Sequence, residues 1–229
     1  GEVATVVVTQ DQALLWTDSR FFISGALQLK GSPFSLMKLG MTDTILPADW
    51  IDANLGEGKV IAGDKRVLFG CIAKKVNKDI DLISPIWSKR PSLPKNKIEV
   101  YPAEYSGEAT SDRIERILSD VEAHGGKTLF LSALDEVAWA LNLRGSDIHC
   151  TPVFLAYALL SRDGSKLYVD QDKVTDEVRK AMEAANVEIE DYDSVNLEVL
   201  RAESSPYNPI QLMKGIKNNV EIEGFRNAM

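Results

Sequence analysis

Residues 132–157 constrain the fold more than any other stretch, because they join a helix, a polar turn and a buried strand with hardly a spare residue. Apolar side chains first recur at the spacing of one helical face, which predicts a short packed helix. They are Leu134, Val137, Ala138 and Leu141. A turn-forming cluster, Arg-Gly-Ser-Asp at 144–147, then ends this pattern, and residues 153–160 form an apolar run of strand length. We expect this strand to be covered on both faces.

The other segments alternate between strand-like and helix-like patterns. Runs of apolar and β-branched residues predict strands, the first two paired as a hairpin, at 3–8, 13–16, 34–39, 59–62, 127–131, 166–169 and 187–189. Helical spacing, with Asp18 as the cap of the first helix, is found at 19–29, 47–55, 79–87, 114–121, 175–185 and 210–229. This alternation predicts the α/β class.

Two proline-containing segments mark the expected domain boundaries. Residues 89–94, Lys-Arg-Pro-Ser-Leu-Pro, form the clearest boundary in the chain. A second linker at 204–209 precedes a helical tail that is too short to form a domain of its own. We therefore expect domains at 1–92 and 93–203, with 204–229 as a linker and the start of a third unit. Because the chain opens directly in a hydrophobic strand, we also expect the first domain to lack its first elements.

Composition excludes several classes of partner. The net charge is -8, and no run is rich in lysine and arginine, which argues against nucleic acid and anionic membranes. The sequence has neither an apolar stretch of about 18 residues nor a secretory signal, so we expect a cytoplasmic protein. Cys71 and Cys150 are too few for a disulfide framework, and their spacing does not suit a metal site. We expect both to be buried free thiols.

Common catalytic motifs are missing from the sequence. It contains no HExxH, GxGxxG, Walker, GxSxG or paired CxxC pattern. Only His124 and His149 are available, which gives little support to a histidine-rich metal site or a Ser/His/Asp triad. His124 ends a predicted helix and is expected to act as a C-terminal cation or a solvated side chain. His149 follows the polar turn and stays open as a candidate, although a loop histidine without a catalytic part is favoured.

Two polar clusters are candidates for ligand binding. Arg144 and Asp147 lie in a glycine-containing turn, where they either pair with each other, which is favoured, or present charge to a ligand. Trp16, Asp18 and Arg20 lie where a strand meets a helix, a position at which α/β sheets commonly contact ligands. The planar guanidinium of Arg20 suits a carboxylate or a peptide carbonyl, and a surface ion pair explains the spacing equally well.

The same segments carry the motifs of a known family. Residues 15–22, LWTDSRFF, look like the pattern WTDGRYF, and residues 36–40, LMKLG, look like LMKMG. Residues 86–91 match IWxxRP, and residues 133–148 with 152–157 follow a longer pattern nearly throughout. Residues 216–226 are similar to KNxxExEGMR. Together these segments resemble the N-terminal part of aminopeptidase P, the Xaa-Pro aminopeptidase of the creatinase/prolidase family, most closely its cytosolic three-domain type.

The resemblance implies two tandem creatinase N-terminal-type domains, each a mixed sheet flanked by helices, followed by the first helix of a pita-bread catalytic domain. It implies an activity that removes the N-terminal residue from peptides with proline in second position. A hydroxide that bridges two divalent metal ions, expected to be manganese, performs this reaction. The family's metal ligands lie beyond Met229, so no catalytic or metal-ligating residue is expected in this chain. The chain alone is expected to be inactive.

The resemblance also ranks the candidate site residues. Arg20 matches the arginine of WTDGR, which helps to bind the peptide, whereas Arg144, Asp147 and His149 are weaker substrate-binding candidates. Ser19 replaces the motif's glycine and leaves the arginine in place. Segments 64–79 and 193–204 are shorter than the family implies, either by deletion or, as we favour, because loop residues are left out of this sequence.

The expected partners are Xaa-Pro peptides and, for the full-length protein, a second copy in a homodimer, with neither nucleic acid nor membrane. One alternative is a catalytically inactive creatinase-like module that binds peptides or proteins, as histone-chaperone relatives do.

Overall fold

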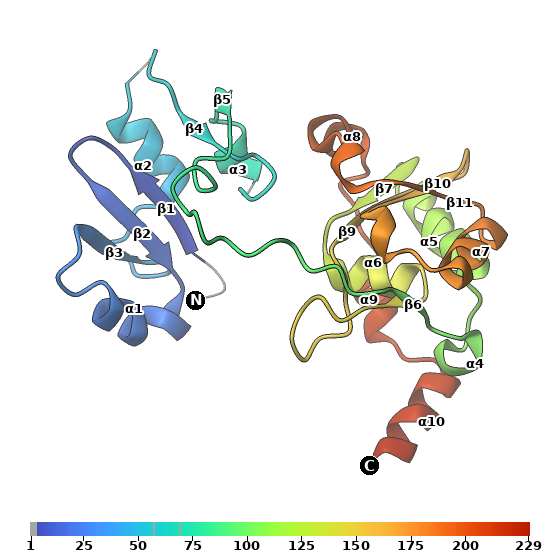
Figure 1. The fold of residues 1–229 in the computed structure, drawn as a ribbon. Coiled ribbons are helices and arrows are strands. Elements are labelled where there is room, and N and C mark those ends of the chain that lie inside the picture. The colour runs from blue at the N-terminus through green and yellow to red at the C-terminus, as the bar shows by residue number, and fades with distance from the viewer. Residues whose placement is uncertain (1–3, 57, 69) are drawn as a thin grey trace. The chain divides into compact units, whose positions relative to one another are not determined.

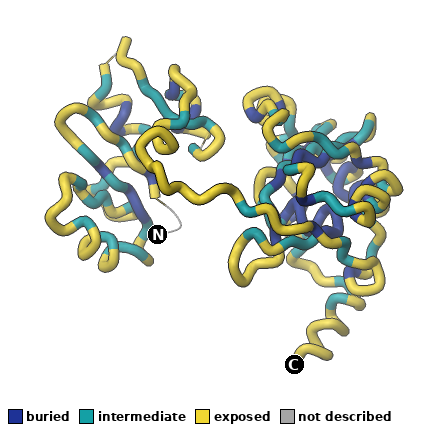
Figure 2. Tube along the Cα trace, viewed as in Figure 1, coloured by how far each residue is buried: buried dark blue, intermediate teal, exposed yellow. Residues whose placement is uncertain are grey.

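The computed structural model describes residues 4–56, 58–68 and 70–229, and the chain divides into two compact units, Gly1–Pro91 and Ser92–Met229 (Figure 1). Each unit has its own sheet and its own hydrophobic core. Figure 2 shows buried residues along the sheet of the first unit and gathered inside the second. Both units mix helices with strands, so the predicted α/β class is confirmed.

The first unit is built on a three-stranded sheet in the order β1-β2-β3. Strands β1 (Ala4–Val8) and β2 (Ala13–Thr17) pair antiparallel as the predicted hairpin. The short helix η1 (Ser19–Phe21) and α1 (Phe22–Gln28) then lead to β3 (Phe34–Lys38), which is parallel to β2. The sequence thus places residue 18 directly after the carboxyl end of a parallel strand.

Aromatic packing holds the core of the first unit together. Trp16 is fully buried, donates its indole N–H to the Ile45 carbonyl at 2.8 Å and meets the ring of Trp50 edge-on. Trp50 comes from α2 (Pro47–Asn54), which begins at Pro47 as predicted, and α3 (Gly70–Ala73) adds Ile72. Of the predicted strand 59–62, only residue 62 is in a strand, β4 (Ala62–Gly63), which pairs parallel with β5 (Lys78–Asp79).

The predicted helix over residues 79–87 is wrong. The carboxylate of Asp81 accepts hydrogen bonds from the backbone of Ile83 and Ser84, at 2.8 and 3.0 Å, and from the Ser84 hydroxyl. Such local bonds offer the backbone an alternative to a helical turn. The supposed apolar face is also exposed, because Ile83 and Trp87 are each 50% accessible. Helical spacing without burial did not produce a helix here.

The second unit contains a mixed four-stranded sheet in the order β11-β10-β9-β7. Its strands are β7 (Thr128–Leu131), β9 (Ala156–Ser161), β10 (Ser165–Val169) and β11 (Val187–Asp191). β10 and β11 are parallel and the other pairs are antiparallel. The main helices that pack with these strands are α5 (Thr110–Ala123), α6 (Leu134–Ala140) and α7 (Asp176–Ala184). β9 begins three residues later than predicted. Its residues alternate between buried and partly buried, so one of its faces is fully covered and the other only in part.

Short elements surround this sheet and form the base of the polar turn. β6 (Glu99–Val100) pairs antiparallel with β8 (Leu143–Arg144). The remaining short helices are α4 (Ala103–Ser106), η2 (Gln171–Lys173), η3 (Tyr192–Ser194) and α8 (Leu197–Glu203). Helix α8 lies in a region for which the sequence predicted neither a helix nor a strand.

The tail forms two helices where one was predicted, namely α9 (Ile210–Gly215) and α10 (Asn219–Ala228). Ile210 is fully buried in the core of the second unit. Ahead of it, Tyr207 stacks on His124 with a ring separation of 3.8 Å. In contrast, α10 buries none of its residues, although Asn218 and Glu221 close a capping box at its start. The first half of the tail therefore packs on the second unit.

Both thiols are exposed, so the expectation of buried cysteines is wrong. Cys71 lies on the four-residue helix α3, and Cys150 lies in the loop after β8 with a left-handed φ of 59°. Cys71 lies on the exposed side of a helix whose Ile72 and Ala73 are buried, and Cys150 lies at a loop tip. Among the described residues, no helix is long and apolar enough to cross a membrane.

Candidate functional site

Arg20 lies at the carboxyl end of the parallel pair β2 and β3. The Asp18 carboxylate accepts from the Arg20 backbone N–H at 3.1 Å, which caps η1. The same carboxylate accepts from Nε and Nη2 of Arg20, at 2.9 and 2.8 Å, so the two side chains form a bidentate pair. The Arg20 side chain is 65% exposed, and its guanidinium lies 5.3 Å from the ring centre of Phe21. Local turn geometry thus holds an accessible arginine at the edge of the sheet.

The ion pair of Asp18 and Arg20 lies at the protein surface. Hydrogen bonds from the Arg20 side chain, more than any other effect, hold the pKa of Asp18 below its usual range. Because the pair is exposed, solvent screens it and its contribution to stability is small. The guanidinium can therefore exchange partners at low cost, as a ligand-binding arginine must. The surface ion pair left open by the sequence is present, and it leaves ligand binding untested.

The Arg-Gly-Ser-Asp turn is arranged differently from the favoured prediction. Asp147 pairs with Lys173 of η2 rather than with Arg144, and the side chains of Asp147 and Lys173 are 0% and 2% exposed. The same carboxylate oxygen accepts from the Leu155 N–H at 2.8 Å, while Asp147 Oδ1 is buried without a hydrogen-bond partner. Asp147 therefore faces inward. The role of Lys173 was not predicted, because no recognisable motif surrounds it in the sequence.

Arg144 folds back on its own unit. Its Nη1 donates to the carbonyls of Ala138 and Leu143, at 3.2 and 2.8 Å, and so satisfies acceptors near the end of α6. The guanidinium also lies over the ring of Tyr101, 4.2 Å from its centre. Burial lowers the pKa of Arg144 from its usual value. Arg144 is thus a partly buried cation, whereas the Asp147 side chain is buried and His149 is exposed.

His149 and Cys150 are exposed in the segment between β8 and β9. An isolated bridge between Ile148 and Thr151 closes this segment into a tight tip. Figure 1 shows the tip as an extended loop that projects from the second unit. The structure thus brings together Asp147 and Lys173 inside the base of the loop, and leaves His149 at its outer end.

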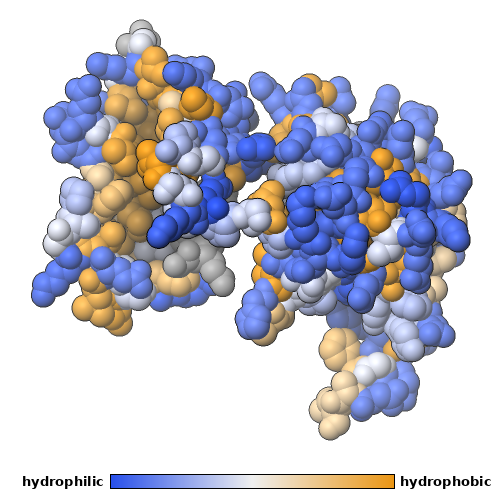
Figure 3. All heavy atoms as spheres, in the orientation of Figure 1, coloured by the Kyte–Doolittle hydropathy of each residue, from blue (hydrophilic) through white to orange (hydrophobic). Residues whose placement is uncertain are grey.

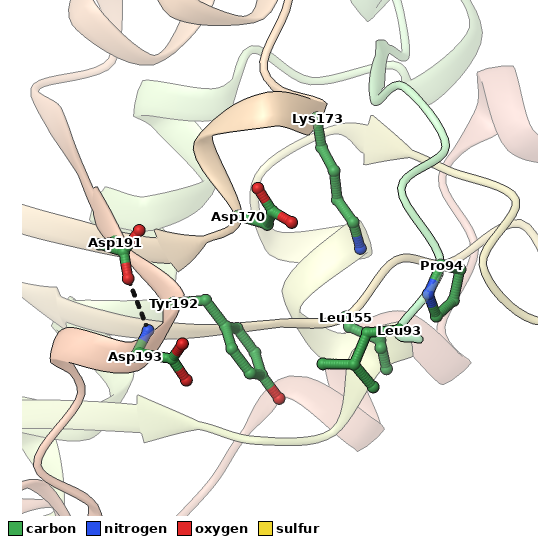
Figure 4. Close-up of a pocket in the computed structure, with 8 residues that line it drawn as sticks. All are labelled: Leu93, Pro94, Leu155, Asp170, Lys173, Asp191, Tyr192 and Asp193. Carbon is green, nitrogen blue, oxygen red and sulfur yellow. Dashed lines mark hydrogen bonds between the residues drawn. The ribbon is translucent and has the colours of Figure 1, made fainter. Parts of the chain in front are cut away.

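A pocket of about 200 Å³ lies beside the buried Lys173 (Figure 4). The apolar side chains of Leu93, Pro94 and Leu155 form one wall, toward which Figure 4 shows the Lys173 side chain extending. Three aspartates and Tyr192 line the rest of the pocket. Two of the aspartates stabilise turns. Asp191 accepts a hydrogen bond from the Asp193 N–H at 2.9 Å, and Asp170 accepts one from the Asp172 N–H. The pocket carries net negative charge, and no sequence motif predicted it.

A second pocket, of about 340 Å³, lies where the tail meets α5 and α6. Trp139 lines it, packs against the buried guanidinium of Arg113 at 4.4 Å and has no acceptor for its buried indole N–H. Arg113 is in turn bound by Glu108 and Asn142, at 2.9 and 2.5 Å. The tail residues Met213, Ile216 and Asn218 line the same pocket.

Within the described ranges 4–56, 58–68 and 70–229, no group of three or more His, Cys, Asp or Glu side chains could hold a metal ion. The acidic residues of the pocket beside Lys173 are engaged in turns and ion pairs instead. The described residues therefore do not fit a metal centre, and we assign no reaction step to a metal held by them.

Known proteins resemble this chain along its length. Residues 89–206 match the Creatinase/Prolidase N-terminal domain. A probable Xaa-Pro aminopeptidase P of Chaetomium globosum is 35% identical over 209 residues, which cover 85% of this chain and 33% of that relative. Another, of Leptosphaeria maculans, is 32% identical over 275 aligned residues, which cover 100% of this chain and 45% of the relative.

A solved structure resembles this chain as well. It is the X-prolyl aminopeptidase of Caenorhabditis elegans, described as a cytosolic enzyme with a di-nuclear active site. The TM-score is 0.85 at 28% sequence identity, over 99% of this chain and 44% of that one. Since 275 aligned positions exceed the 229 residues of this chain, the L. maculans relative also carries insertions.

The matched domain and the mixed α/β fold define the class, the N-terminal region of creatinase/prolidase-type proteins. This chain belongs to the aminopeptidase P family of that class, as its N-terminal portion. It spans between a third and just under half of the length of the relatives described above. The resemblance predicted from the sequence motifs is confirmed.

Proposed function

We propose that this chain is the non-catalytic N-terminal part of a metalloaminopeptidase that releases the N-terminal residue from peptides with proline in second position. The observation that carries the proposal is the match in fold, over 99% of this chain, to an X-prolyl aminopeptidase with a di-nuclear active site. Relatives named Xaa-Pro aminopeptidase P support the same substrate class. The two metal ions, which we propose to be manganese, are held by another part of the protein.

Within this function, Arg20 is the proposed contact to the peptide. Its support is geometric: an exposed guanidinium stands at the carboxyl edge of parallel strands, paired with a partner that it can release. Arg144 is a second proposed contact, and His149 a weaker one. Asp147 is proposed to act through the loop that it holds, because its side chain is fully buried.

We further propose the domain limits 1–92, 93–203 and 204–229, with the last segment leading into the catalytic domain. The exposed apolar residues of α10, Phe225 at 59% among them, support a further packing partner for that helix. A cytoplasmic location and a homodimer of the full-length protein complete the proposal. The cytosolic solved relative supports the location.

The test is an assay of the full-length protein and of residues 1–229 on the same Xaa-Pro peptides. We expect the full-length protein to cleave them after loading with manganese and to lose activity with a chelator. Residues 1–229 should show no cleavage. Absence of cleavage by the metal-loaded full-length protein would reject the enzyme and favour the inactive binding module, while cleavage by residues 1–229 would reject the non-catalytic assignment.

A further inference from the structure

The loop from Arg144 to Leu155 is anchored by a charge pair that is costly to bury. Asp147 and Lys173 are 26 residues apart in sequence, and both side chains are inaccessible to solvent. Removing two charges from water costs free energy, which the attraction between them repays only partly. Asp147 Oδ1 moreover lacks a hydrogen-bond partner. A pair with this cost is better explained by the arrangement it specifies than by stability alone.

A second set of contacts holds the same loop from the side of the chain that enters the unit. Asn96 Nδ2 donates to the Ser146 carbonyl at 3.0 Å, and the backbone N–H of Ile98 donates to the Lys173 carbonyl at 3.0 Å. Lys95 and Lys97 reach the side chain and the carbonyl of Asp172, at 2.7 and 2.5 Å. The entering segment 95–98, the helix η2 and the loop are thus bound to one another.

The base of the loop is rigid in a further respect. The Asp147 N–H donates to the Val153 carbonyl at 3.1 Å, so the two arms of the loop are tied together next to the buried carboxylate. Gly145 lies so close to Phe154 that an added Cβ would stand 2.7 Å from the Phe154 Cβ. Beyond this base, Ile148, His149 and Cys150 are exposed. The loop therefore has a fixed base and a tip that is exposed to solvent.

We propose that Lys173, together with Asp147, is a positioning residue for peptide binding. The pair fixes the loop in one arrangement, in which the exposed tip, residues 148–150, faces the peptide. This inference rests on the proposed function. Lys173 acts through the loop and touches no substrate itself, so its loss should weaken peptide binding rather than the chemical step.

The first arm of the test measures the loop directly, in residues 1–229, by hydrogen exchange resolved to peptides. The variant Lys173→Met/Asp147→Leu removes both charges and leaves no lone buried ion. We expect the amides of 145–155 to exchange about tenfold faster, because the hydrogen bonds that close the loop are lost, while α5 and β10 stay unchanged. The matched control Lys166→Met removes a partly exposed lysine that pairs with Glu190 on the sheet, and should not affect the loop.

The second variant in this arm, Asn96→Ala, removes only an exposed side chain and keeps the fold if the double variant does not. It should accelerate exchange in the same loop, by a few fold, since it loses one hydrogen bond. Unchanged loop exchange in the folded variants would overturn the anchoring role of the pair.

The second arm measures kinetics in the full-length, metal-loaded protein. We expect Lys173→Met/Asp147→Leu to raise KM for Xaa-Pro peptides on the order of tenfold to a hundredfold, with kcat and metal content unchanged. Faster loop exchange without a change in KM would overturn the positioning role. If the unmodified protein cleaves no such peptide, the proposed function fails, and the exchange arm still decides whether the pair holds the loop.

Discussion

Two aspartate–cation pairs, one in each unit, lie in opposite surroundings. Asp18 and Arg20 are two residues apart, and the arginine side chain is 65% exposed. Asp147 and Lys173 come from different elements, and their side chains are buried. An exposed local pair is screened by water and exchanges partners at little cost, whereas a buried pair cannot lose one member without leaving a charge in the core. The first arrangement suits a ligand contact and the second suits a fixed support.

The units that carry these pairs also differ in how much of their apolar surface is buried. The second unit contains the larger buried cluster, which extends from Ile98 to Ile210. The first unit has a small core around Trp16 and exposes apolar residues such as Ile23 at 81% and Leu27 at 70%. In the view of Figure 3 its surface is visibly more hydrophobic than that of the second unit. The accessible arginine thus belongs to the less buried unit.

The largest predicted effect comes from removing one partner of the buried pair. Lys173→Met leaves the Asp147 carboxylate alone in the core and should destabilise the second unit by about 3–5 kcal/mol. Urea unfolding of residues 1–229, followed by a probe in that unit, measures the change. The double variant Lys173→Met/Asp147→Leu should recover most of the loss. A single-variant loss below about 1 kcal/mol would show that the pair is effectively solvated.

A smaller loss is predicted for Gly145→Ala at the base of the loop. The new methyl group would overlap the Phe154 side chain, and such overpacking costs about 1–3 kcal/mol. Gly164→Ala, in the turn between β9 and β10, tests a conformational requirement for glycine instead of a steric one. Gly164 has a φ of 125°, and nothing lies within 4 Å of its Cβ position. Thermal unfolding compares them. Phe154→Leu should rescue neither variant, because leucine keeps the Cβ that a methyl group at residue 145 would meet, and rescue of Gly145→Ala would contradict this steric reason.

The next effect concerns acid stability. The hydrogen bond from Arg116 holds the pKa of Glu108 below its usual value of 4.5, despite partial burial. A depressed folded pKa means that the stabilisation is complete above pH 4.5 and is lost as the pH falls through the folded value. Glu108→Gln should therefore lower stability at pH 7 by about 1 kcal/mol and flatten the acid limb. The exposed control Glu183→Gln should retain the wild-type pH profile, and an equal flattening in both variants would contradict this cause.

The sequence predicted those parts of the fold in which local pattern and burial agree. The hairpin of β1 and β2 and the apolar face of α5 were both found as expected. It failed at residues 79–87, where Asp81 favours local turn bonds, and at the two cysteines, whose exposure depends on tertiary packing. Periodicity reports an apolar face, and it does not report whether another element covers that face.

The candidate site was predictable to a similar extent. The motif around Arg20 pointed to a sheet edge, and the structure has the residue there. The partner of Asp147 was not predictable, since Lys173 lies 26 residues away and no local pattern joins the two. The pairing of Arg144 with Asp147 was favoured on spacing alone, yet the chain turns Asp147 inward and Arg144 toward Tyr101.

We propose that the exposed pair of Asp18 and Arg20 serves ligand binding and that the buried pair of Asp147 and Lys173 supports the fold. Kinetics of Arg20→Ala in the full-length, metal-loaded protein test it most directly. We predict that kcat/KM for Xaa-Pro peptides falls about tenfold or more through a higher KM, while metal content is unchanged and stability changes by less than about 0.5 kcal/mol. Unaltered kinetics, or a loss of activity that merely follows a loss of stability, would contradict the account.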